Sequence, residues 1–315
     1  MLKTEITRML NIEHPLFQGG MAWLATHQLA SAVSKAGGLG VIGAGNAPPQ
    51  WVEEQIVAVR KATDKPFGVN VLLLSPHVDE VMDVIIRQQV PMVTTGAGNP
   101  GPWVDRLKAA GCRVFPLVAS VSLAIRLARM GVDGLVAEGM EAGGHVGEIT
   151  TMALVPQVVD AVNIPVVAGG GIADGRGMAA ALALGAQGVQ VGTRFVCATE
   201  CIAHQNYKHM LIAARDRDAV TSGHSTGHPV RCLKNKMWRE FTRLEKEGAD
   251  PAELEKLGSG RYHAAAILGD VESGSVLAGQ VAAMVKSIQP AEEIIQEIIV
   301  QAIQRIGLLG EMTDE

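Results

Sequence analysis

A single histidine at the end of a glycine-rich stretch is the residue of this sequence best placed for chemistry. Residues 138–147 have the sequence EGMEAGGHVG, in which His145 directly follows Gly143 and Gly144. An imidazole exchanges its proton near neutral pH, and glycines let the backbone approach a flat ligand closely because they have no Cβ. His145 is therefore our candidate catalytic residue, and a structural hydrogen bond within the loop is the alternative.

Two more glycine-containing segments follow short apolar runs later in the chain. Residues 168–172 have the sequence AGGGI and residues 190–194 have QVGTR. In barrel proteins, the loops after the last two strands often bind phosphate through backbone N–H groups and a helix N-terminus. Each segment alone is also compatible with a tight turn. Together they predict a phosphate site whose candidate residues are Ala168, Gly169, Gly170, Gly171, Gln190, Gly192 and Thr193.

Polar or small residues also follow other apolar runs. Gly20, Met21 and Ala22 come after the first run, Asn70 ends the third, and Glu138 ends the sixth. Amide and carboxyl groups beside glycines suit the heteroatoms of a ring, and the phosphate site would anchor its other end. We therefore expect a flat phosphorylated cofactor, with flavin mononucleotide (FMN) as the best fit and a phosphate-binding barrel without flavin as the fallback.

The elements that position these residues alternate regularly along the chain. Apolar runs typical of buried strands begin near residues 15, 39, 67, 91, 113, 134, 165 and 188. Amphipathic helical patterns lie between most of them, over residues 25–36, 50–63, 77–89, 102–110, 122–130, 153–162 and 174–184. Many of these patterns end at a glycine, which is a helix C-cap signal. Eight such units predict an α/β fold of the (β/α)8, or TIM barrel, type.

The pattern becomes more polar and irregular after the eighth run. We expect residues 1–195 and 275–315 to form the barrel and residues 196–274 to form an inserted substrate or lid segment. Residues 275–288 are predicted to supply the last barrel helix. A final helix over residues 291–306 has a wide apolar stripe, which predicts packing either on the barrel or against a second subunit.

Two further patterns, a GxGxxG match and a group of Cys and His residues, resemble ligand-binding motifs but lack their context. Residues 38–43 match GxGxxG, but a helical pattern precedes them and the motif is itself a strand, so we reject a dinucleotide-binding turn. Cys197, Cys201 and His204 could share a helix face, but metal sites usually have tighter spacing, so we predict core packing and no metal site.

Composition excludes several classes of protein. The 315 residues are 48% hydrophobic but only 3% aromatic, which fits a parallel sheet covered by helices. The net charge of −5 gives no indication of nucleic-acid binding, which is usually marked by an excess of basic residues. We expect no signal peptide and no membrane insertion, because residues 1–8 carry an acid and the longest uncharged run includes polar residues and glycines. Four cysteines without CxxC spacing indicate free thiols and a cytoplasmic protein.

At this point the sequence resembles a known family over nearly its whole length: the FabK-type flavin-dependent enoyl-[acyl-carrier-protein] reductases, within the nitronate monooxygenase-like superfamily. EGMEAGGHVG, AGGGI and QVGTRF are shared across the superfamily. The segments that look more particular to the reductases are QGGMAW (18–23), GHPVRCLKN (227–235) and GDVESGSVLAGQ (269–280). Nitronate monooxygenases usually have a QAPMA-like stretch where this chain has QGGMA, and this difference favours the reductase.

The resemblance implies FMN, NADH or NADPH as co-substrate, a homodimer, an acyl carrier protein that carries the enoyl substrate, and stimulation by a monovalent cation. It implies reduction of the trans-2 double bond in fatty acid synthesis, with His145 stabilising the enolate or protonating the α-carbon. The alternatives are a nitronate monooxygenase that uses the same loop with oxygen, and a flavin-binding protein without turnover.

A basic run after residue 230 is a candidate site for the acidic carrier protein. It comprises Arg231, Lys234, Lys236, Arg239, Arg243 and Lys246. Met237, Phe241 and Leu244 recur at helical spacing, so one face of this helix can be buried while the other presents charge. A solvated helix face is an equal alternative.

Overall fold

The barrel is a ring of eight parallel strands whose order follows the chain. The computed structural model describes residues 2–312. Neighbouring strands pair in the order β1-β9-β8-β6-β5-β4-β3-β2, and a bridge between Phe17 and Leu39 joins the two ends. The strands are β1 (Leu16–Gln18), β2 (Gly40–Gly45), β3 (Phe67–Leu72), β4 (Met92–Gly96), β5 (Arg113–Val118), β6 (Leu135–Glu138), β8 (Val166–Gly169) and β9 (Gly188–Val191). The predicted (β/α)8 fold is confirmed.

Helices cover the outside of this ring, and their ends agree with the sequence pattern to within about two residues. They are α2 (His27–Lys35), α3 (Pro49–Ala62), α4 (Val78–Arg87), α5 (Gly101–Ala109), α6 (Val121–Arg129), α7 (Thr151–Ala161) and α8 (Gly175–Ala183). The glycines that follow four of them, Gly37, Gly111, Gly131 and Gly185, have φ between +80° and +94°. Side chains other than glycine rarely adopt this left-handed conformation, which explains why helices stop there.

Apolar side chains fill the inside of the ring. One core cluster contains Phe17, Met92, Phe115 and Val167, with the rings of Phe17 and Phe115 edge to face at 5.9 Å. Ile6 and Leu10 of α1 (Glu5–Leu10) belong to the same cluster, so α1 closes one end of the barrel. The opposite end, where the parallel strands finish, is left for polar residues.

The buried side chain of Gln18 completes the ring between β1 and β2. The backbone bonds between these strands end early, at Leu39 N–H to Leu16 and Gln18 N–H to Leu39. The carboxamide of Gln18 then accepts a hydrogen bond from Val41 N–H and donates one to the Val41 carbonyl oxygen, both at 3.1 Å. The carboxamide thus makes the two hydrogen bonds to Val41 that a backbone peptide group would make if β1 continued.

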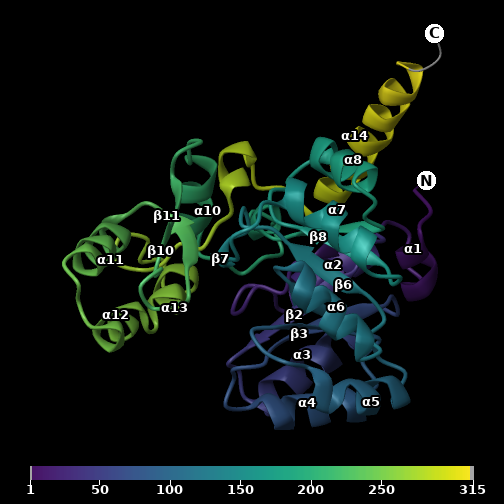
Figure 1. Ribbon diagram of the computed structural model, residues 1–315, viewed down its shortest axis with the longest axis horizontal. Coiled ribbons are helices and arrows are strands. Elements are labelled where there is room, and N and C mark those ends of the chain that lie inside the picture. Colours follow the sequence, from purple (N-terminus) through teal and green to yellow (C-terminus); the bar gives the residue numbers. More distant parts are fainter. Residues whose placement is uncertain (1, 313–315) are drawn as a thin grey trace.

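Within the segment 196–274, which we predicted to be an insertion, the helices and strands from α10 to α13 form a smaller assembly beside the barrel (Figure 1). Its helices are α10 (Gln205–Ile212), α11 (Lys236–Lys246), α12 (Pro251–Gly258) and α13 (Arg261–Ala266), and its strands are β10 (Ala219–Ser222) and β11 (Val230–Leu233). A two-residue strand from the barrel loops, β7 (Gly144–His145), joins these strands in one antiparallel sheet. Within residues 2–312, no helix combines the length and apolar character needed to cross a membrane.

The predicted last barrel helix over residues 275–288 is wrong. This segment is extended apart from one 3-10 helix, η1 (Gln280–Met284), because its backbone binds other loops: Gly279 N–H donates to Thr193 and Gln280 N–H to Glu141. The chain closes the barrel instead with α14 (Ala291–Glu311), which packs on α8 and α2.

The first part of α14 packs on the barrel, which was one of the two arrangements predicted for this helix. Its buried side chains are Ile294, Ile295, Ile298, Ile299 and Ala302. Beyond them, Ile303, Ile306 and Leu309 are exposed, and Figure 1 shows this end of the helix projecting from the body of the molecule.

Replacing Gln18 by leucine should destabilise the barrel by about 2–4 kcal/mol, since it leaves the N–H and C=O of Val41 buried without partners. Gln18→Glu should cost at least as much at neutral pH, because a buried carboxylate accepts from Val41 N–H but faces the Val41 carbonyl oxygen without a proton to donate. The free energy of unfolding in urea measures both. Equal stability of Gln18→Leu and the parent protein would contradict a role for this side chain in ring closure.

Candidate active site at the barrel rim

Polar side chains from several strands meet where the barrel strands end. In the strand registers, Glu138 lies opposite Gly169, which in turn lies opposite Gln190. Gly169 has no side chain between its neighbours, so Gln190 Nε2 reaches 3.4 Å from a Glu138 carboxyl oxygen. The structure thus brings together three of the predicted cofactor-binding residues in one row across three strands.

The Glu138 carboxyl has an unusual acidity. Burial at the end of β6 raises its pKa to about 7, and the hydrogen bond from Gln190 opposes this only in part. A carboxyl of this kind is half protonated near neutral pH and can either donate or accept a hydrogen bond. It faces the barrel rim, where a ligand would contact it.

The loop after β1 packs tightly over the neighbouring strands. Asn70 Nδ2 donates to the Gly20 carbonyl oxygen at 3.2 Å, and Asn70 Oδ1 accepts from the Thr94 hydroxyl at 2.8 Å. A Cβ on Gly20 would lie 2.1 Å from the Cβ of Asn70, so only glycine fits. Asn70 is fixed on both sides, and Met21 and Ala22 are held half-buried at the rim.

His145 is positioned by the assembly beside the barrel, not by its own strand β6. In the β7–β11 pairing, His145 lies opposite Val230 and Gly144 opposite Arg231, and Val146 N–H donates to the Pro229 carbonyl oxygen at 3.1 Å. Gly144 has φ +82°. His145 is exposed at the rim, and its pKa is lowered first by partial burial and second by the nearby His228.

Arg231 holds the base of the His145 loop. Its guanidinium donates from Nε and an Nη to the Met140 carbonyl oxygen at 3.1 and 3.0 Å, and it is only 3% exposed. Its predicted place in a surface run of basic residues is therefore wrong. Arg231 lies on β11, and only Lys236, Arg239, Arg243 and Lys246 of that run lie on helix α11. The alternating pattern Val-Arg-Cys-Leu was the available signal for a strand.

Glu141 is a positioning residue that the sequence analysis missed. Its carboxylate accepts hydrogen bonds from the N–H and hydroxyl of Thr151, at 2.9 to 3.0 Å, at the start of α7. The Thr151 hydroxyl also lies 3.1 Å from the Gly170 carbonyl oxygen. Glu141 therefore ties the His145 loop to the predicted phosphate loop. A glutamate ten residues before a helix start gives no local cap signal.

The two glycine loops of the predicted phosphate site lie side by side, after the adjacent strands β8 and β9. Gly170 and Gly171 have φ of +86° and +69°, and a Cβ built on Gly192 would meet nothing within 4 Å. The Thr193 hydroxyl accepts from Gly279 N–H at 2.9 Å and keeps its own proton free to donate. Among residues 2–312, the N–H of Gly171 makes no hydrogen bond. Asp174 caps α8 as expected, through the N–H groups of Arg176 and Gly177.

The patterns set aside in the sequence have structural explanations. Residues 40–43 of the GxGxxG match belong to β2, and helix α2 precedes them. Cys197 and Cys201 are buried, and burial raises the pKa of both thiols to about 11. Within the described residues, no three His, Cys, Asp or Glu side chains lie close enough to hold a metal ion.

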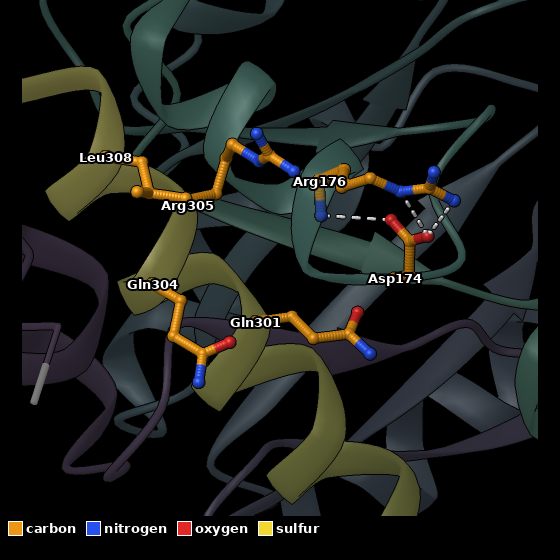
Figure 2. Close-up of a pocket in the computed structure, with 6 residues that line it drawn as sticks. All are labelled: Asp174, Arg176, Gln301, Gln304, Arg305 and Leu308. Carbon is orange, nitrogen blue, oxygen red and sulfur yellow. Dashed lines mark hydrogen bonds and ion pairs between the residues drawn. The ribbon is translucent and has the colours of Figure 1, made fainter. Parts of the chain in front are cut away.

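Two hollows lie on the outer surface near α8 and α14. One, of about 290 Å³, is lined by Arg176, Gln301 and Arg305 among others, with Arg176 paired to Asp174 as Figure 2 shows. The other, of about 230 Å³, also borders Asp174 and Gln301. Neither is lined by His145, Glu138 or Asn70, so the polar rim remains the candidate site.

Comparison with known proteins shows which family this chain is similar to. A family model described as nitronate monooxygenase matches residues 3–301. The chain is 35% identical to a probable nitronate monooxygenase of Staphylococcus aureus, over 96% of this chain and 98% of that protein. It is 46% identical to FabK from Thermotoga maritima, with a TM-score of 0.97, over 99% of this chain and all of that one. Nitroalkane oxidase from Streptomyces ansochromogenes is 28% identical, with a TM-score of 0.86, over 96% and 99% of the two chains. The resemblance noted from the sequence is confirmed.

The raised pKa of Glu138 predicts an effect of pH on stability. A folded-state pKa near 7 against 4.5 means that the folded protein favours the protonated carboxyl, so this contribution is present below pH 4.5 and is lost as pH rises through 7. Glu138→Gln should therefore be more stable than the parent by about 2–3 kcal/mol at pH 8, and equally stable at pH 4. Urea unfolding at both pH values tests this, with the exposed loop residue Glu148→Gln as control. A pH-independent difference would rule out the carboxyl as its source.

Proposed function

This chain belongs to the nitronate monooxygenase family, and we propose that within it the protein is an FMN-dependent enoyl-[acyl-carrier-protein] reductase. The observation that carries the proposal is the 46% identity to FabK over 99% of the chain, against 28% to the nitroalkane oxidase. The QGGMAW segment at the rim supports the same choice, because Gly20 is required there by its contact with Asn70.

The residues at the rim fit FMN. The N–H of Gly171, the Thr193 hydroxyl and the open space at Gly192 form a cradle in which a phosphate can lie close to the backbone. Gly143 and Gly144 offer a surface without side chains to a flat ring. Asn70, Glu138 and Gln190 supply both donors and acceptors for ring heteroatoms. A donor set of this composition suits an anionic, planar cofactor.

The chemistry that bound FMN supplies is hydride transfer, from NADH or NADPH to the β-carbon of an enoyl thioester. Negative charge then develops on the thioester oxygen. An imidazole nitrogen of His145 would donate to that oxygen or pass its proton to the α-carbon. Arg231 and the β7–β11 pairing hold the ring in place, while Glu141 fixes the loop to the phosphate cradle.

A second candidate is nitronate monooxygenase, which the family model and the names of the Staphylococcus aureus relatives favour. In that reaction His145 would remove a proton from a nitroalkane, and oxygen would be the oxidant. The rim geometry serves both reactions, because both need a proton-exchanging group above a flavin. The choice depends on the substrate that the assembly of residues 196–274 admits.

The activity test is to purify the protein, identify the flavin it releases, and follow NADH and NADPH oxidation with an enoyl thioester, alongside oxygen consumption with a nitronate. We expect thioester-dependent oxidation of the nicotinamide. His145→Ala should lower this turnover by a factor of about 10²–10⁴ while FMN stays bound. Turnover of the nitronate alone would establish the second candidate, and full turnover by His145→Ala would remove the histidine from the mechanism.

The acyl carrier protein is the proposed partner, and the exposed face of α11 is its proposed docking site. Lys236, Arg239, Arg243 and Lys246 are exposed on this helix, Met237 is buried, and Arg243 pairs with Glu247. Carriers are acidic as a class, so their charge complements this face. The homodimer and the stimulation by a monovalent cation stay predictions of the resemblance.

Reversing two of these charges, in Lys236→Glu combined with Arg239→Glu, should raise KM for a carrier-bound substrate about tenfold at low salt. KM for a small enoyl thioester should not change, since α11 lies away from the rim. Lys35→Glu combined with Lys61→Glu, on helices α2 and α3, is the matched control. Equal effects on the two substrates would show that α11 has another role.

A further inference from the structure

A second imidazole faces His145 from the neighbouring assembly. The rings of His145 and His228 are edge to face, with centroids 6.5 Å apart. Their backbones are fixed relative to each other, because His145 pairs with Val230 and the next residue along each segment, Val146 and Pro229, share a hydrogen bond. The ladder therefore keeps the backbone positions that carry the two rings close together.

The other charged groups near His145 either form hydrogen bonds elsewhere or are exposed to solvent. On its own loop, Glu141 accepts from Thr151 and Glu148 is exposed. On β11, Arg231 donates to the carbonyl oxygens of Met140 and Ala219. Residues 275–284, which pack against the same loop, carry no charged side chain. His228 is thus the titratable group that faces the His145 ring.

We propose that His228 is a positioning residue whose imidazole, when positively charged, disfavours the charged form of His145 and so sets how readily His145 gives up its proton. This role rests on the proposed function, in which His145 supplies a proton. Two positive charges about 6 Å apart repel even where water screens them. Consistent with this, His228 contributes to the lowered pKa of His145. His228 itself does not touch the reacting atoms.

The test is an NMR titration of the histidine side chains in the holoenzyme, with His145→Ala used to assign the His145 resonances. In His228→Gln, the pKa of His145 should rise by about two or three tenths of a unit. In His228→Lys, which carries a positive charge throughout the titration, it should fall, so that the two variants differ by about half a unit. His224→Gln is the matched control, since His224 lies in the same segment but bonds to Thr221.

The opposite signs of the two substitutions separate charge from structure. A loosened β7–β11 pairing would move the pKa of His145 in the same direction in both variants, and that result, or no shift in either, would overturn the proposal. The pH dependence of kcat/KM for the enoyl thioester should shift in the same sense as the NMR pKa. The titration needs no turnover, so an enzyme that shows the coupling but reduces no enoyl thioester would refute the proposed function and leave the coupling established.

Discussion

The structure depends on closure of the parallel ring, and closure depends on a side chain. Every buried N–H and C=O of a strand needs a partner, yet β1 is only three residues long and its backbone ladder with β2 stops at Leu39. The Gln18 carboxamide supplies the missing pair of bonds to Val41. Because β1 ends there, the chain is free to turn over the rim and place Gly20 against Asn70.

Glycines at the rim then decide what kind of ligand the closed ring can accept. Gly169 leaves the gap through which Gln190 reaches Glu138, and Gly192 leaves open space beside the phosphate cradle. Side chains at these positions would fill the surface that the proposed flat, phosphorylated cofactor needs. Glu138 itself is buried at the end of β6, and this burial raises its pKa.

The His145 loop links the barrel to the smaller assembly. Its strand β7 has only two residues and pairs with β11, while Arg231 binds Met140 at the base of the loop. On its other side the loop is held to the start of α7, where Thr151 N–H donates a hydrogen bond to the Glu141 carboxylate. The imidazole of His145 is therefore held between the barrel and the smaller assembly.

The sequence by itself determined the eight strands, the seven helices between them and the glycine loops, since apolar periodicity and turn residues are local signals. It also placed His145, Asn70, Glu138 and the phosphate loops at one rim, because parallel strands finish on the same side. Only the tertiary structure decided that residues 275–288 are extended, that α14 closes the barrel, that Arg231 is buried, and that Glu141 and His228 flank the histidine loop. These features come from contacts between segments far apart in the chain, such as Thr193 with Gly279, Arg231 with Met140, and α14 with α2. Such partners leave no local pattern in the sequence, because the two segments come into contact only when the chain has folded.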